Sequence, residues 1–60
     1  MIGDNIKFYR KKNQLTQDDI AEACNVTRQA VSKWENGESL PTVDNLYALS
    51  RLLHTSVDDG

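Results

Sequence analysis

The sequence has few of the features that cross-link, anchor or address a protein. Its 60 residues include one cysteine and one proline. Because Cys24 has no second cysteine to pair with, the chain can form no internal disulfide, which suits a reducing compartment. No apolar run approaches the roughly 20 residues that cross a bilayer, and residues Met1–Asp4 lack the basic and apolar segments of a secretory signal. We therefore expect a cytoplasmic chain without a membrane-spanning segment.

A strong charge of one sign is also absent. Seven basic and nine acidic residues give a net charge of −2, and the isoelectric point is near 5.1. A strongly basic chain would indicate a nucleic-acid partner, and this chain is not basic. The charges are nevertheless unevenly placed, since Lys7 and Arg10–Lys12 gather in one segment while Asp18, Asp19 and Glu22 share the next. Net charge therefore neither indicates nor excludes such a partner.

Size and composition favour one small globular domain covering residues 1–60. Hydrophobic residues make up 38% of the chain and charged residues 27%, which is typical of a folded domain rather than a disordered tail. There is no repeat, low-complexity tract or linker-like stretch. A chain of this length buries only about 60% of its unfolded surface, so its core must be small.

Turn-forming residues divide the chain into four helical segments and the beginning of a fifth. The breaks fall at Asn13-Gln14, Asn25, Asn36-Gly37, Pro41 and His54-Thr55. Apolar residues recur at helical spacing in the first and last full segments. These residues are Ile2, Ile6 and Tyr9 in the first, and Val43, Leu46, Leu49 and Leu53 after the candidate cap Thr42. Ser56 could cap a final turn, but the chain stops at Gly60, about where a fifth helix would need an apolar residue, as in a chain trimmed at its C-terminus. The predicted fold is a compact all-α bundle of four to five helices.

The second segment begins with a dense set of helix-start signals. Thr16 is the candidate N-cap, and Asp19 at the third helical position can complete a capping box. Leu15 before the cap and Ile20 four residues after it form a hydrophobic staple. Asp18 and Asp19 also lie where the helix dipole favours negative charge. These carboxylates therefore have a structural explanation, and a catalytic one is unnecessary.

The third segment repeats this design after a short turn. Thr27 is its candidate N-cap, and Val26 and Val31 form its staple. Only residues 25–27 separate the two helices, a length typical of a helix pair joined at a steep angle. The third helix is predicted to end at Asn36, with Gly37 at the left-handed position that glycine favours.

One face of the third helix carries polar side chains suited to reading DNA. Ala30, Val31 and Trp34 mark its buried side, which leaves four polar residues facing outward. These are Arg28, Gln29, Ser32 and Lys33. Arginine and lysine donate to guanine, and glutamine can make a bidentate contact with adenine. A recognition helix presents its N-terminal residues to the bases, which is where most of these residues lie. A solvated polar face remains the alternative.

The stretch Leu15–Gly37 resembles the helix-turn-helix of the Xre, Cro and phage-repressor family. The likeness rests on Thr16-Gln17 opening the second helix, Val26-Thr27 in the turn and the closing sequence of residues 34–37, Trp-Glu-Asn-Gly. It extends upstream to Ile6 and downstream to Leu53. The resemblance implies a lambda-repressor-like fold and a sequence-specific transcriptional regulator, most often a repressor. Because one short helix reads too few bases, we also expect a homodimer that binds a palindromic operator.

The resemblance assigns roles to individual positions. The residues that it implies for DNA contact are Gln17, Thr27, Arg28, Gln29, Ser32, Lys33 and Asn36. Among these, Arg28, Gln29 and Lys33 are the base readers, while Gln17 and Asn36 contact phosphates. The resemblance further implies that Arg10 and Glu35 form a charged pair joining the first helix to the end of the third. Arg10 is therefore structural and is not counted among the DNA contacts.

Other functions have weaker support in the sequence. No Ser/His/Asp or Cys/His set has a plausible arrangement, so we expect no enzyme, and neither a cofactor nor a small-molecule ligand is indicated. His54 stands alone, which argues against a metal site, and Cys24 is expected to be a buried, unreactive thiol. The main alternative is a protein-interaction or antitoxin-type helix-turn-helix module with little DNA specificity. The acidic balance and the non-basic loop Glu38–Leu40 favour that alternative. Arg28, Gln29 and Lys33 together argue against it.

Overall fold

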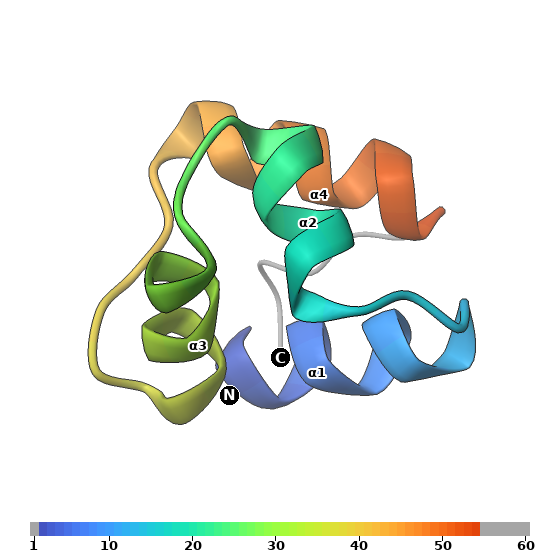
Figure 1. Cartoon of the computed structure of the whole chain (residues 1–60), viewed down its shortest axis with the longest axis horizontal. Helices are drawn as coiled ribbons and strands as arrows, with labels where there is room; N and C mark the ends of the chain where they lie inside the picture. Colours follow the sequence, from blue (N-terminus) through green and yellow to red (C-terminus); the bar gives the residue numbers. More distant parts are fainter. Residues whose placement is uncertain (1, 55–60) are drawn as a thin grey trace.

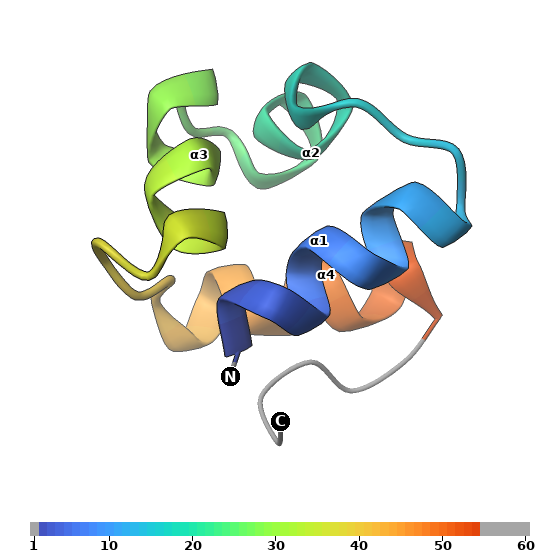
Figure 2. The same cartoon turned by 90° about the horizontal axis from the view of Figure 1, so that it is seen from below.

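The structure is a computed structural model that describes residues 2–54, and within that range it consists of helices joined by short turns. The helices are α1 (Ile2–Lys12), α2 (Gln17–Cys24), α3 (Arg28–Asn36) and α4 (Val43–Leu53). Helix α3 packs against both α1 and α2, and α2 also packs against α4 (Figure 1). Figure 2 shows α2 and α3 on one side of the molecule and α1 and α4 on the other. The all-α prediction is confirmed; the suggested cap at Ser56 lies outside the described residues.

The helices begin where the capping residues predict. At α2 the Asp19 amide donates to Thr16 Oγ1 at 3.0 Å, and the Thr16 amide donates back to Asp19 Oδ2 at 2.8 Å. This second bond is the main reason that the pKa of Asp19 lies below its ordinary value. Thr27 and Thr42 cap α3 and α4 in the same way, by accepting from the amide three residues later at 3.1 and 3.2 Å. The sequence thus fixes the start of each of these three helices locally.

Left-handed residues end α2 and α3 and set the direction of the next segment. Asn25 follows α2 with φ at 57°, and the Val26 amide bonds back to the Ala21 carbonyl at 3.0 Å. Gly37 follows α3 with φ at 78°, and the Glu38 amide donates to the Lys33 carbonyl at 2.8 Å. The three residues between α2 and α3 therefore form the short turn that the sequence predicts.

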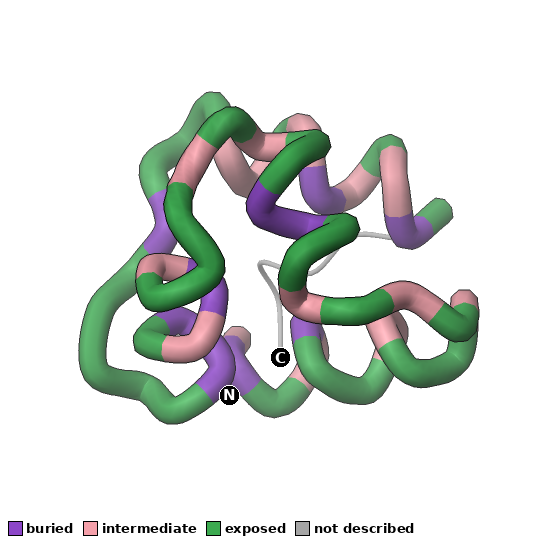
Figure 3. The backbone as a smooth tube through the Cα atoms, viewed as in Figure 1, coloured by how far each residue is buried: buried purple, intermediate pink, exposed green. Residues whose placement is uncertain are grey.

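The core lies where the four helices meet, and every helix contributes to it (Figure 3). Its buried apolar residues are Ile6, Ile20, Ala21, Val31, Trp34, Leu49 and Leu53. Trp34 is only 4% exposed, so it is a core residue rather than a surface stacking platform. None of the helices described here is long and apolar enough to cross a membrane.

Several expectations about apolar positions need correction. Val43 fits the apolar spacing of α4 but is 81% exposed; it is the first residue of the helix, and the nearby Pro41 is buried instead. Cys24 is half-buried rather than buried, and this partial burial raises the pKa of its thiol. Ala30 is likewise half-buried. Phe8, for which no burial was predicted, is mainly exposed, with its ring edge-on to that of Tyr9.

Candidate nucleic-acid interface

A buried ion pair joins the C-terminal end of α3 to α1. Arg10 Nε donates to Glu35 Oε2 at 2.7 Å, and Arg10 Nη2 donates to Glu35 Oε1 at 3.1 Å. The side chains of Arg10 and Glu35 are only 12% and 2% exposed. Arg10 Nη1 also donates to the Leu15 carbonyl at 3.0 Å, which attaches the loop before α2. The fork of the guanidinium matches the carboxylate in this geometry, so the expected Arg10–Glu35 pair is present.

Gln17 joins α2 to the same carboxylate. Its Nε2 donates to Glu35 Oε1 at 3.1 Å, so Glu35 accepts hydrogen bonds from two other helices. Gln17 is half-buried, and its side-chain oxygen and second N–H remain available for another partner. Through this contact Gln17 also holds α3 against α2, in addition to the phosphate contact that the resemblance implies for it.

Gly3 allows α1 to approach the end of α3 closely, a role that no sequence pattern predicted. A Cβ at Gly3 would overlap the Trp34 carbonyl oxygen and would lie 3.0 Å from the Glu35 carbonyl oxygen. The glycine is buried within the first turn of α1. A glycine near a predicted helix start was the only signal available, and it does not indicate which backbone the helix will meet.

Four of the predicted DNA-facing residues line one hollow. It has a volume of about 220 Å³ and is lined by Gln17, Arg28, Gln29 and Ser32. Gln17 comes from the first position of α2, and the other three come from the N-terminal half of α3. A second hollow of about 490 Å³ also includes Gln17 and Arg28, and it extends across Arg10 to Leu15–Asp18. The two hollows share a wall, so they form one continuous polar surface at the N-terminal ends of α2 and α3.

The remaining predicted residues extend this surface along α3. Residues four apart lie in rows on a helix, so Arg28, Ser32 and Asn36 form one row, and Gln29 and Lys33 form the next. All of these except Ser32, which is half-buried, are exposed. Thr27 is exposed too, but its hydroxyl accepts the capping bond from the Ala30 amide. The structure thus brings Gln17 and the α3 rows onto one side, with Asn36 at the far end.

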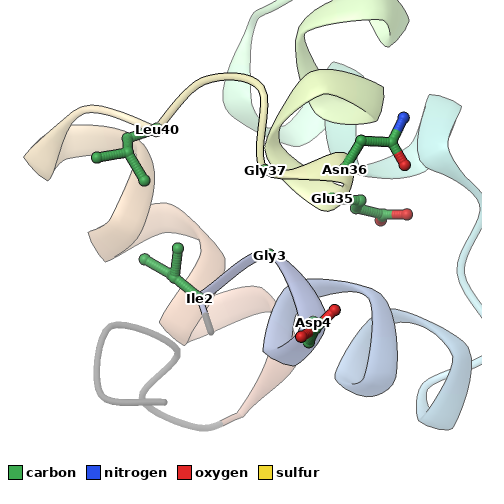
Figure 4. A pocket seen from close by; sticks show the side chains of 7 residues that line it. All are labelled: Ile2, Gly3, Asp4, Glu35, Asn36, Gly37 and Leu40. Atoms are coloured by element: carbon green, nitrogen blue, oxygen red, sulfur yellow. The ribbon is translucent and has the colours of Figure 1, made fainter.

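The other end of α3 borders a separate hollow. It has a volume of about 200 Å³ and lies between the first turn of α1, the end of α3 and the following loop (Figure 4). Its lining residues are Ile2, Gly3, Asp4, Glu35, Asn36, Gly37 and Leu40. Except for Asn36, none of these belongs to the predicted DNA-facing set. No group of three or more histidine, cysteine or acidic residues among residues 2–54 could hold a metal ion.

Comparisons with known proteins show the family to which the chain belongs. The helix-turn-helix family profile matches residues 6–59. The chain belongs to this family, in the branch of the Xre, Cro and phage-repressor proteins. It is 44% identical over 55 residues to the HTH-type transcriptional regulator DicA of Escherichia coli K12, covering 92% of this chain and 41% of DicA. It is 36% identical over 58 residues to repressor protein C2 of Salmonella phage P22, covering 97% of this chain and 27% of C2.

Solved structures show the same fold. The crystal structure of the P22 c2 repressor in complex with a synthetic operator matches with a TM-score of 0.88 at 36% identity, covering 97% of this chain and 88% of that one. The crystal structure of SinR, a master regulator for biofilm formation, in complex with DNA matches with a TM-score of 0.83 at 32% identity, covering 98% of this chain and 95% of that one. The chain spans less than half the length of the curated relatives DicA and C2.

Proposed function

We propose that residues 1–60 form one domain that binds double-stranded DNA sequence-specifically. The domain acts as part of a transcriptional regulator, and repression is its favoured role. The observation that carries this proposal is the hollow formed by Gln17, Arg28, Gln29 and Ser32 at the N-terminal ends of α2 and α3. The side chains that line it can donate hydrogen bonds to phosphates, and they can exchange hydrogen bonds with the edges of bases. The likeness to repressor structures solved with operator DNA supports the same conclusion.

The residues divide into base readers and phosphate contacts. Helix α3 enters the major groove, where Arg28 and Lys33 donate to guanine and Gln29 pairs with adenine. Thr27 and Ser32 lie beside them, near the start of α3. Gln17 and Asn36 contact phosphates at the two ends of this surface. Since Glu35 accepts hydrogen bonds from both Arg10 and Gln17, the groove-facing side of α3 is held before DNA arrives.

A homodimer on a palindromic operator completes the proposal. One nine-residue helix contacts too few bases to define a site, whereas two copies would read half-sites about one helical turn apart. Sedimentation velocity with and without the duplex tests this stoichiometry. The protein would act in the cytoplasm, where its DNA target lies, and it would need neither catalysis nor a cofactor.

Selection from a random duplex library at low salt tests the proposed function. We expect an enriched palindromic motif whose affinity falls steeply with salt, with a slope near −0.9 per phosphate neutralised. A library that returns no enriched motif would contradict the proposal and would favour the protein-interaction or antitoxin-type module. The net charge of −2 is the feature of the sequence that favours this alternative.

A further inference from the structure

We propose that Glu38 lowers the affinity of this domain for DNA by engaging the side-chain amide of Asn36 and by repelling the phosphate that this amide would contact. The inference rests on the proposed function, because it concerns an interface that binds phosphates. It adds an affinity-setting residue that lies outside the predicted contact set. It also gives a physical reason for the non-basic loop after α3.

The backbone fixes Glu38 next to the end of the candidate interface. Gly37 turns the chain in the left-handed conformation, with φ at 78°. The Glu38 amide then donates to the Lys33 carbonyl at 2.8 Å, and the Ser39 amide approaches the same oxygen at 3.4 Å. These bonds close the last turn of α3. The backbone of Glu38 therefore has a defined position, two residues after Asn36.

The side chain of Glu38 uses a donor that a phosphate would need. Asn36 Nδ2 lies 3.5 Å from Glu38 Oε2 and 3.5 Å from Ser32 Oγ. An amide nitrogen has two N–H donors, so both face acceptors within the protein. A carboxylate attracts such a donor more strongly than a hydroxyl does. A phosphate that accepts from Asn36 therefore competes with Glu38 and Ser32 for the donors of this amide.

The loop that carries Glu38 has no basic residue to offset its negative charge. Asp18, another acidic residue on this surface, has a basic residue nearby. Asp18 lines the larger hollow together with Arg28, so a basic side chain shares its surroundings. The loop of residues 37–42 contains no lysine or arginine. Glu38 is also exposed, so its carboxylate lies close to an approaching phosphate. At a separation of about 7 Å in water, such a like-charge contact lowers affinity by about threefold.

Binding of the selected duplex by Glu38→Gln tests this inference. We expect the variant to bind about threefold more tightly for each protomer at low salt, and this gain should shrink at high salt because ions screen it. Glu22→Gln is the matched control, since it removes the same charge from an exposed position on α2. Adding Asn36→Ala should reduce the gain from Glu38→Gln, because the amide for which carboxylate and phosphate compete is then absent.

The outcomes separate this inference from the proposed function. If the wild-type chain binds the duplex and Glu38→Gln binds equally or less tightly, the role of Glu38 is wrong while the proposed function stands. An equal gain from Glu22→Gln would also overturn the inference, because a general change in net charge would then explain it. If the wild-type chain binds no duplex at all, the proposed function fails first.

Discussion

Replacing Glu35 by alanine should remove a large part of the stability of this domain. The substitution deletes the acceptor of two hydrogen bonds from Arg10 and one from Gln17. It leaves the guanidinium, whose side chain is 12% exposed, without its carboxylate. Removing one partner of a buried pair costs about 3–5 kcal/mol. A domain of 60 residues has a total stability of roughly 3–9 kcal/mol, so Glu35→Ala should unfold easily.

Urea denaturation followed by circular dichroism at pH 7 measures this cost. The matched control is Glu22→Ala, which removes an exposed acid and should change the free energy of unfolding by less than about 0.5 kcal/mol. The double variant Arg10→Met with Glu35→Leu removes both charges together. It should recover at least half of the loss, because no buried charge is left without a partner. A cost below about 1 kcal/mol for Glu35→Ala would refute the reasoning.

Three further predictions concern residues around the same interface. Gly3→Ala should lower the free energy of unfolding by about 1–3 kcal/mol, because its Cβ would overlap the Trp34 carbonyl; a thermal melt that matches wild type would contradict this. Since the pKa of Asp19 is lowered in the fold, its stabilisation is present above the ordinary value of 3.8 and is lost as the pH falls through the lower folded value. Melting temperatures from pH 2 to 7 should therefore depend less on pH in Asp19→Asn than in wild type, and equal dependence would count against the capping box. Gln17→Ala should weaken binding to all duplex sequences alike, by roughly fivefold for one hydrogen bond, and a change in base preference in the same binding assay would be inconsistent with a phosphate contact.

The helix starts were predictable because their signals are local. Thr16 and Asp19 satisfy each other across one turn, so their side-chain chemistry alone defines the beginning of α2. Gly37 similarly marks the end of α3, since a positive φ favours glycine. The pattern of outward-facing residues on α3 followed from helical spacing once these ends were known.

Contacts between distant segments were harder to predict. The approach of Gly3 to the carbonyls of residues 34 and 35 depends on how α1 crosses α3, which no local pattern encodes. Val43 fitted the apolar spacing of α4 but is exposed, and helical spacing alone does not show how much of a helix lies against the core. The pair of Arg10 and Glu35, 25 residues apart, was expected only from the family resemblance.

The base preference of Arg28→Ala, compared with wild type in the same duplex selection, tests the central claim most directly. If α3 reads bases through this exposed side chain, the variant should lose discrimination at particular positions of each half-site, at a cost of about 1–3 kcal/mol for the preferred base. Preferences at the other positions should persist. An unchanged motif, or a uniform loss across all positions, would contradict the assignment of Arg28 as a base reader.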